Sequence, residues 1–112
     1  MDCVFCKIIN GEIPSTKVYE DDRVLAFKDI EPKAPVHFLV VPKEHIESTA
    51  KIDESNSDIV AHIFEVIAKL AKELDFEECF RVVTNTGDLA GQSVKHLHFH
   101  VLAKRSLAWP PG

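Results

Sequence analysis

Near its carboxyl end the chain reads His96-Leu97-His98-Phe99-His100-Val101-Leu102, a run in which histidine and apolar residues alternate strictly. Such alternation predicts a β-strand, because successive side chains of a strand point to opposite faces. The apolar residues then face the core, and the imidazoles share the other face at a spacing of about 6.6 Å along the strand. Imidazoles in this arrangement can surround one small anion or metal ion. A polar edge strand that merely presents histidines to solvent is the alternative interpretation.

The length and composition of the chain limit its architecture and its partners. A chain of 112 residues, 46% of them hydrophobic, is expected to form one domain over residues 1–112 with a single core. The net charge of −5 argues against a nucleic-acid-binding surface, because phosphate backbones are held mainly by clustered lysine and arginine. A small phosphorylated ligand in a pocket is compatible with this charge.

The amino-terminal sequence and the cysteines indicate a cellular compartment. Residues 1–7 contain an acid at position 2 and no long apolar run, so we expect neither a signal peptide nor a membrane span, and a cytoplasmic protein. Three cysteines, two of them spaced Cys3-x-x-Cys6, suit a reducing compartment in which thiolates stay free or bind metal. We expect Cys79 to lie in the core and His62 on the surface of a helix.

The rest of the chain predicts an antiparallel sheet with helices. Further β-prone runs are expected to form strands at 17–20, 23–27, 37–41 and 80–84. Asp21-Asp22 suits the turn of a hairpin between the first two strands, and the proline-bearing segment 29–35 is expected to be a rigid loop. A mostly apolar run over residues 3–10, closed by Gly11, predicts a short helix. Short strands with one long helix among them indicate an α+β fold.

The long helix is expected at about residues 56–75. Ser55 and Asp58 resemble a capping box, and apolar residues recur at helical spacing through Leu74. The apolar stripe is widened by Val60, Phe64, Ile67 and Ala71. Part of this stripe meets either another subunit or simply a broad core face, and the sequence leaves both interpretations open.

Together these features resemble the histidine-triad (HIT) superfamily, and within it the Hint branch. The alternating histidine run is similar to the triad motif of that superfamily. The resemblance covers most of the chain, through Asp29-Ile30, Ala34-Pro35-x-His37, Asn85-x-Gly87, Gly91-Gln92-Ser93 and the terminal Trp109-Pro110-Pro111-Gly112. It implies a HIT-like fold, with an antiparallel five-stranded sheet, one long helix and a short N-terminal helix, assembled as a homodimer with a continuous sheet.

The resemblance implies a nucleotidyl hydrolase or transferase acting at the α-phosphate of a nucleoside phosphoramidate, with purine nucleotides as ligands and no metal in catalysis. His98 is implied as the nucleophile. A neutral imidazole suits this role, because its unperturbed pKa of about 6.5 leaves a ring nitrogen free at neutral pH. His37 and His100 are implied as donors to the phosphate oxygens and as orienters of His98. Ser93 is implied to lie near the leaving group.

The resemblance also implies how the nucleotide is held. Asp29 is expected to accept hydrogen bonds from the ribose hydroxyls. The base pocket, for which an ordinary place in the core is the alternative, is expected to be lined by Phe5, Ile8, Phe27, Ile30 and Leu39. The phosphate is expected to contact Asn85 and the backbone of Gly91, Gln92, Ser93 and Val94, since glycine permits close approach. The tail that carries Trp109 is expected to approach the partner subunit's active site.

A second group of residues, Cys3, Cys6, His45 and His96, suits a tetrahedral zinc site with two thiolate and two imidazole ligands. The order and long gaps do not match a zinc finger, so only the fold can bring these ligands together, as in Hint-like proteins that hold structural zinc. A filled four-ligand site is closed, so this metal is expected to pin the N-terminus to the sheet and not to activate water. The alternative is a free pair of cysteines with His45 facing solvent.

Other functions fit parts of the sequence. The dinucleoside polyphosphate hydrolases of the Fhit branch share the triad, although the Trp109-Pro110-Pro111-Gly112 end argues against them. A non-catalytic nucleotide-binding or zinc-binding interaction module uses the triad only to hold phosphate or metal. A metal hydrolase binds catalytic zinc through His96, His98 and His100. A serine hydrolase is excluded locally, because the sequence after Ser93 lacks the second glycine of a nucleophile elbow.

Overall fold

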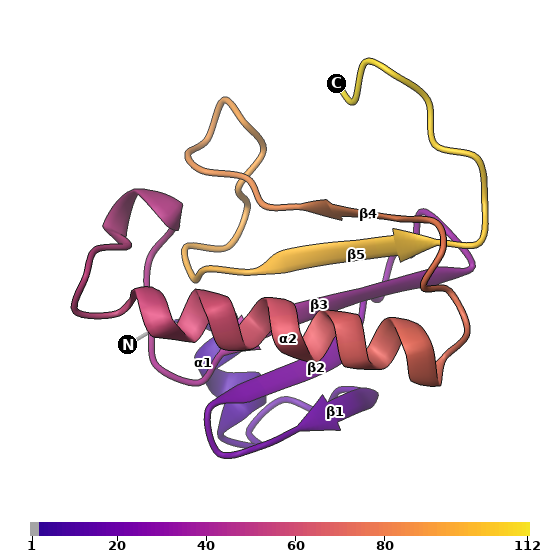
Figure 1. The fold of residues 1–112 in the computed structure, drawn as a ribbon. Helices are drawn as coiled ribbons and strands as arrows, with labels where there is room; N and C mark the ends of the chain where they lie inside the picture. Colours follow the sequence, from indigo (N-terminus) through magenta and orange to yellow (C-terminus); the bar gives the residue numbers. More distant parts are fainter. Residues whose placement is uncertain (1–2) are drawn as a thin grey trace.

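Five antiparallel strands form one sheet in the computed structural model of the protein, which describes residues 3–112 (Figure 1). The strands are β1 (Lys17–Glu20), β2 (Val24–Lys28), β3 (Val36–Pro42), β4 (Phe80–Val83) and β5 (Phe99–Ala103), and their order across the sheet is β1-β2-β3-β5-β4. The helical elements are α1 (Val4–Ile9), the short 3-10 helix η1 (Thr49–Lys51) and α2 (Ser57–Glu73). The predicted α+β fold is confirmed, with a long helix and a short N-terminal one.

The central strands β2 and β3 are buried on both faces, which explains their continuous apolar sequences. Val24, Ala26, Phe38 and Val40 belong to the core under α2. The residues between them point the other way and form a second, smaller core with Cys3 and Phe5 at α1: Leu25, Phe27, Leu39 and Val41. By the same alternation, His37 lies on the α1 face of β3. The sheet therefore separates a structural face under α2 from a face that carries imidazoles.

Helix α2 lies across the sheet through a stripe of buried residues that includes Ile59, Ile63 and Ile67 (Figure 1). The predicted capping box is wrong: the N-cap is Asn56, and the Ser55 hydroxyl donates to the Asp53 carboxylate instead. Asn56 makes no cap bond, since its amide bridges the Asp53 N–H and the Lys51 carbonyl. In the wider stripe Ile67 and Ala71 are buried and Val60 is half-buried, but Phe64 is 46% exposed.

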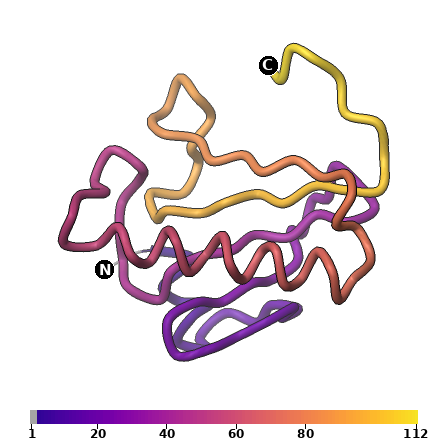
Figure 2. Tube along the Cα trace, viewed as in Figure 1, coloured from indigo at the N-terminus to yellow at the C-terminus, as the bar shows by residue number. Residues whose placement is uncertain are grey.

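Strand β5 begins at Phe99, so the prediction that the strand starts at His96 is wrong. Before this point the Leu97 N–H donates to the Ile46 carbonyl at 2.6 Å, which draws the chain away from the sheet ladder. The alternation of side chains persists nevertheless, and Leu97, Phe99 and Val101 are buried in the core under α2. Figure 2 shows the β4–β5 pair and the β1–β2 hairpin at opposite edges of the sheet.

Asp21 connects the β1–β2 hairpin to α2. Its carboxylate accepts hydrogen bonds from the N–H groups of Arg23 and Val24, from the Tyr19 hydroxyl at 2.9 Å and from His62 Nε2 at 2.7 Å. Burial raises the pKa of Asp21, but these hydrogen bonds outweigh it and lower the pKa to about 2. His62 is thus half-buried and paired, where the sequence predicted a simple surface residue.

Replacing Asp21 with asparagine is expected to reduce stability by about 1.5–3 kcal/mol at neutral pH, the usual range for hydrogen bonds to a charged group. Because the folded-state pKa lies below the unfolded one, the contribution is complete above about pH 4 and is lost as the pH falls toward 2. Urea melts between pH 2 and 7 measure both effects. Asp22→Asn, at an exposed neighbour, is the control. Equal melting profiles for the two variants would contradict this account.

The turn between α2 and β4 places Cys79 on the surface, so its predicted position in the core is wrong. Cys79 directly precedes β4 and follows Phe76, which fills the core position of this turn.

Among residues 3–112, no helix combines the length and apolar character that crossing a membrane requires.

Candidate functional site

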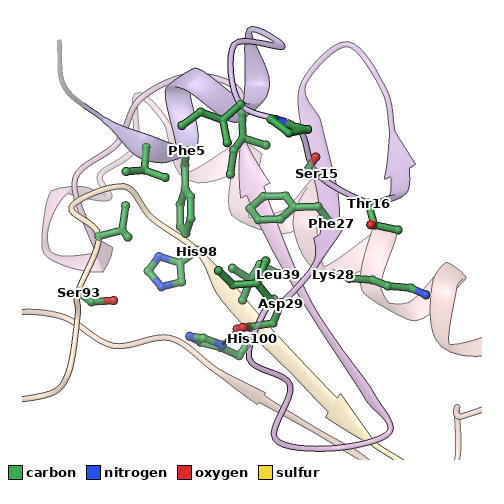
Figure 3. Close-up of a pocket in the computed structure, with 16 residues that line it drawn as sticks. Phe5, Ser15, Thr16, Phe27, Lys28, Asp29, Leu39, Ser93, His98 and His100 are labelled. Atoms are coloured by element: carbon green, nitrogen blue, oxygen red, sulfur yellow. Dashed lines mark ion pairs between the residues drawn. The ribbon is translucent and has the colours of Figure 1, made fainter.

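A cavity of about 710 Å³ lies beside α1 and is lined by every residue predicted for the base pocket (Figure 3). Phe5, Phe27 and Leu39 are buried in its wall, whereas Ile30 is 94% exposed at its rim. Polar groups gather at one end, where Figure 3 shows Ser93, His98, His100 and Asp29. The cavity thus joins an apolar compartment to a polar one, as small-molecule sites commonly do.

His98 is held in one orientation by its surroundings. Its Nδ1 lies 2.7 Å from the main-chain carbonyl oxygen of His96, and since a carbonyl only accepts, Nδ1 carries the proton. The Phe5 ring packs edge-on against the imidazole, with centroids 5.0 Å apart. Burial lowers the pKa of His98, although the bond to His96 opposes the shift. The imidazole is therefore neutral at neutral pH, with its lone pair on Nε2 at the cavity that it lines.

His37 and His100 form a hydrogen-bonded pair whose protons can be assigned. The Lys33 N–H donates to His37 Nδ1 at 3.0 Å, so the His37 proton is on Nε2. This Nε2 lies 3.0 Å from His100 Nδ1 and donates to it, which leaves the His100 proton on its own Nε2. Burial and the neighbouring imidazoles lower the pKa of His100 to about 4, and burial lowers that of His37. His100 therefore offers an N–H donor beside the His98 lone pair, with the two ring centroids 5.1 Å apart.

Asp29 lies between the cavity and this pair of imidazoles. One carboxylate oxygen accepts the Glu31 N–H at 2.7 Å, and the other is 3.4 Å from His37 Nε2. Its negative charge opposes the pKa depression of both His37 and His100. Asp29 also lines the cavity, so its predicted bonds to the ribose stay compatible with this position.

The loop before His96 uses several of its polar groups within the protein. The Gly91 and Gln92 N–H groups donate within the loop, to the Asp88 and Gly87 carbonyls, and their contact with a phosphate stays a prediction. The Gln92 side chain is buried and braces the loop by donating to the Glu47 and Val94 carbonyls. Ser93 and Val94 do line the cavity, and within residues 3–112 their N–H groups have no hydrogen-bond acceptor.

Two other predicted ligand contacts lie outside this cavity. Asn85 lines an adjoining hollow, which contains His37 and shares Asp29, Ile30 and His100 with the cavity. Trp109 is 80% exposed, in a tail whose Ala108 carbonyl accepts a hydrogen bond from Arg81. Neither side chain reaches the cavity within one chain, so the predicted role of Trp109 depends on a second subunit.

The four predicted zinc ligands converge at the start of α1. Their donor atoms all lie within 4.8 Å of one another, with Cys6 Sγ 3.3 Å from His45 Nδ1 and Cys3 Sγ 3.4 Å from His96 Nδ1. A zinc ion with bonds of about 2.3 Å to sulfur and about 2.0–2.1 Å to nitrogen requires tetrahedral edges of about 3.5 Å between sulfur and nitrogen and about 3.3 Å between nitrogens. The distance between the two Nδ1 atoms is 3.2 Å. The donor geometry therefore fits a structural zinc ion, as predicted.

The proton positions of His96 support the same conclusion. His96 Nε2 lies 2.8 Å from the Pro42 carbonyl oxygen and donates to it, so Nδ1 presents a lone pair to the cluster. Burial lowers the pKa of His96 to about 4, which keeps the ring neutral. The fold thus separates His96 from His98 and His100, which argues against the alternative in which these three imidazoles share one anion or metal site.

Several groups that shape the site have no signal in the sequence. The carbonyls of His96 and Pro42 and the N–H of Lys33 fix the histidine protons, yet every residue type supplies such groups. The Thr84 hydroxyl donates to the His98 carbonyl at 2.8 Å and ties it to the end of β4. The cavity wall is completed by residues that the sequence did not single out: Val4, Ile13, Pro14, Ser15, Thr16 and Lys28.

Comparison with known proteins identifies the family to which this chain belongs. Residues 2–108 match the family model described as "Scavenger mRNA decapping enzyme C-term binding". A 14 kDa zinc-binding protein of Zea mays is 46% identical over 111 residues, which cover 97% of this chain and 87% of that protein. A HIT family hydrolase from Legionella pneumophila has a TM-score of 0.96 and 44% identity, covering 99% of this chain and 100% of that one. A histidine triad protein from Clostridium difficile has a TM-score of 0.93 and 60% identity, covering 96% of this chain and 95% of that one. The chain therefore belongs to the histidine-triad (HIT) superfamily.

Proposed function

We propose that this protein hydrolyses nucleoside 5′-phosphoramidates at the α-phosphate through a covalent nucleotidyl-histidine intermediate on His98. The observation that carries the proposal is the orientation of His98. Its Nδ1–H donates to the His96 carbonyl, so the unprotonated Nε2 is available at the cavity. The Legionella relative, a HIT family hydrolase, supports a hydrolytic reaction. Within the superfamily, the Hint branch remains our prediction from the sequence.

The cavity suits a nucleoside monophosphate group. A purine base packs against Phe5, Phe27 and Leu39 in the apolar compartment, and the ribose lies toward Asp29. The phosphate then lies at the polar end, where the Ser93 and Val94 N–H groups and the His100 Nε2–H act as donors to its oxygens. These donors stabilise the charge that builds on the phosphate oxygens during transfer.

The reaction follows in two displacements. In the first, the Nε2 lone pair of His98 forms a bond to phosphorus while the bond from phosphorus to the amine nitrogen breaks. The departing nitrogen takes a proton through the Ser93 hydroxyl, which regains one from water. In the second, a water molecule attacks phosphorus and gives up a proton that neutralises the hydroxide left by the first step, the bond to Nε2 breaks, and the nucleoside monophosphate leaves. His98 is regenerated as the neutral imidazole, and the net reaction consumes one water molecule.

The test is intact-protein mass spectrometry after rapid acid quench with adenosine 5′-phosphoramidate. We expect the protein mass to increase by one adenylyl group during turnover, located on the peptide that contains His98. If product forms without an adduct, a substrate whose second step is slower is used, and continued absence of the adduct would contradict the covalent mechanism. If nucleotide binds and neither adduct nor product forms, the protein is a binding module. Faster turnover of dinucleoside polyphosphates would favour the Fhit-like alternative.

Ser93→Ala is expected to slow the cleavage of substrates with amine leaving groups by about 10²-fold, the lower range for a general acid–base contribution. A substrate whose leaving group departs without protonation, such as a mixed anhydride with a strong acid, is expected to lose less than about threefold, because it does not need this step. Steady-state rates for the two substrate types measure the difference. An equal loss for both would assign Ser93 to binding and not to proton transfer.

We also propose that two copies associate through the β4 side of the molecule into a homodimer with a continuous sheet. Strand β4 is an edge strand, and the side chains of Phe80 and Phe64 nearby are 37% and 46% exposed. Light scattering is expected to give the mass of two chains.

Deleting residues 107–112, the tail with the exposed Trp109, is expected to change the preference among leaving groups several-fold while the melting temperature stays within about 2 °C. Unchanged selectivity would contradict a role of the tail.

A further inference from the structure

We infer that the Cys3–Cys6 segment, with the metal that its donors fit, is a positioning device for His98; this inference rests on the proposed function. Two contacts fix the His98 imidazole, the packing of Phe5 and the bond to the His96 carbonyl. Each contact comes from a residue that is part of the metal cluster or lies between two of its ligands. A closed metal site, which does not itself touch the substrate, thereby controls the geometry of the nucleophile.

The first contact depends on α1. Phe5 lies between Cys3 and Cys6, and its ring meets His98 at 5.0 Å and 87° and Phe27 at 5.4 Å. Helix α1 has six residues, of which Phe5 is the buried one. A helix this short is not stable by itself, so its position depends on tertiary contacts. The two cysteine ligands, one on either side of Phe5, therefore determine where the ring lies.

The second contact depends on His96. The ring of this residue is fully buried, with Nδ1 in the metal cluster and Nε2 on the Pro42 carbonyl, while its main-chain carbonyl accepts the His98 proton at 2.7 Å. Both ends of the ring are thus anchored, and the backbone of His96 is anchored with them. If the cluster opens, one of these anchors is lost and the acceptor for His98 Nδ1 shifts.

Without a cation, the four ligand side chains are expected to move apart. The Nδ1 atoms of His45 and His96 are 3.2 Å apart, and the His96 lone pair points into the cluster. With no ion between them, these atoms have only one another as partners, and the thiols of Cys3 and Cys6 are weak hydrogen-bond donors. The proton of His37, in contrast, is fixed by the Lys33 N–H in the loop at 29–35, outside the cluster. His37 is therefore an internal reference for changes that are specific to His98.

The test uses long-range ¹H–¹⁵N NMR on the full chain at neutral pH, without substrate, which reports the proton position of each histidine. Spectra are taken with one equivalent of zinc, after removal of the metal by a chelator, and after zinc is restored. We expect His98 to be the Nδ1–H form with zinc, a mixture of both forms without it, and the Nδ1–H form again after restoration, while His37 stays Nε2–H throughout. An unchanged His98 in the metal-free protein, or a joint change of His98 and His37, would overturn the inference.

A second variant keeps the test valid if the metal-free protein unfolds. Phe5→Leu is expected to retain one zinc per chain, to give the mixed His98 form and to slow adduct formation at saturating substrate by about tenfold or more, because small misplacements of a reacting group are costly. Phe38→Leu, in the opposite core against Phe76, is the matched control and is expected to leave His98 and adduct formation unchanged. A parent-like spectrum and rate for Phe5→Leu would count against the inference. Because the spectra need no substrate, a protein that shows the zinc-dependent change without any adduct would refute the proposed function alone.

Discussion

Replacing His98 with alanine is expected to abolish turnover of adenosine 5′-phosphoramidate, with a loss of about 10³-fold or more, and to abolish the adenylyl adduct. Methyl replaces the ring nitrogen that attacks phosphorus, and no other imidazole is oriented to take its place. His100 is the nearest candidate, but its Nδ1 accepts the His37 proton and its Nε2 carries its own, so it has no lone pair to offer the cavity. Quenched-flow mass spectrometry and steady-state rates measure the two losses.

Nucleotide binding provides the control for this variant. Most of the wall of the apolar compartment is formed by residues other than His98, Phe27 and Leu39 among them, so we expect the dissociation constant for the product nucleotide to change by less than about tenfold. His62→Ala, on α2 at the other face of the sheet, is expected to keep the parent rate. Full activity or an intact adduct in His98→Ala would exclude His98 as the nucleophile.

The second large effect is on stability. Cys3→Ser is expected to lower the unfolding free energy of the zinc-loaded protein by about 3–4 kcal/mol, since free zinc at about 10²–10³ times its dissociation constant contributes about this much. The effect is specific to the metal, because Cys3 also caps α1 by accepting the Cys6 N–H, and serine is a good N-cap that preserves this role. What serine removes is the thiolate ligand.

The measurement is thermal melting at several free zinc concentrations. The melting temperature of the parent is expected to rise with free zinc and that of Cys3→Ser to remain nearly constant. Cys79→Ser, at an exposed cysteine far along the chain, is the matched control and is expected to stay within about 0.5 kcal/mol of the parent. A zinc-independent parent, or equal losses in the two variants, would show that the cluster does not bind the metal that its geometry fits.

Local rules of sequence predicted the elements well where hydrophobic pattern governs them. The alternation from His96 to Leu102 gave the correct faces, because side-chain direction in an extended chain has a period of two whether or not the ladder continues. The start of the strand was wrong, since the Leu97 N–H binds the Ile46 carbonyl, far away in the chain. The start of α2 near residue 56 was predicted correctly, but the capping box was wrong for a similar reason: the N-cap is Asn56, and its side chain bonds Asp53 and Lys51.

Residue type settled which chemistry is present: imidazoles supply a neutral nucleophilic nitrogen, and imidazoles and thiols together supply zinc ligands. Their spacing in the chain is visible without coordinates. The fold settled how they are divided. His96 turns to the cysteines of α1, and His98 and His100 turn to the cavity, although all lie on one side of the same run. The fold also determines which ring nitrogen of each histidine carries the proton, through the carbonyls of His96 and Pro42 and the N–H of Lys33. Such main-chain groups are common to all residues, so a sequence cannot mark them, and only their positions in space select the nitrogen that attacks.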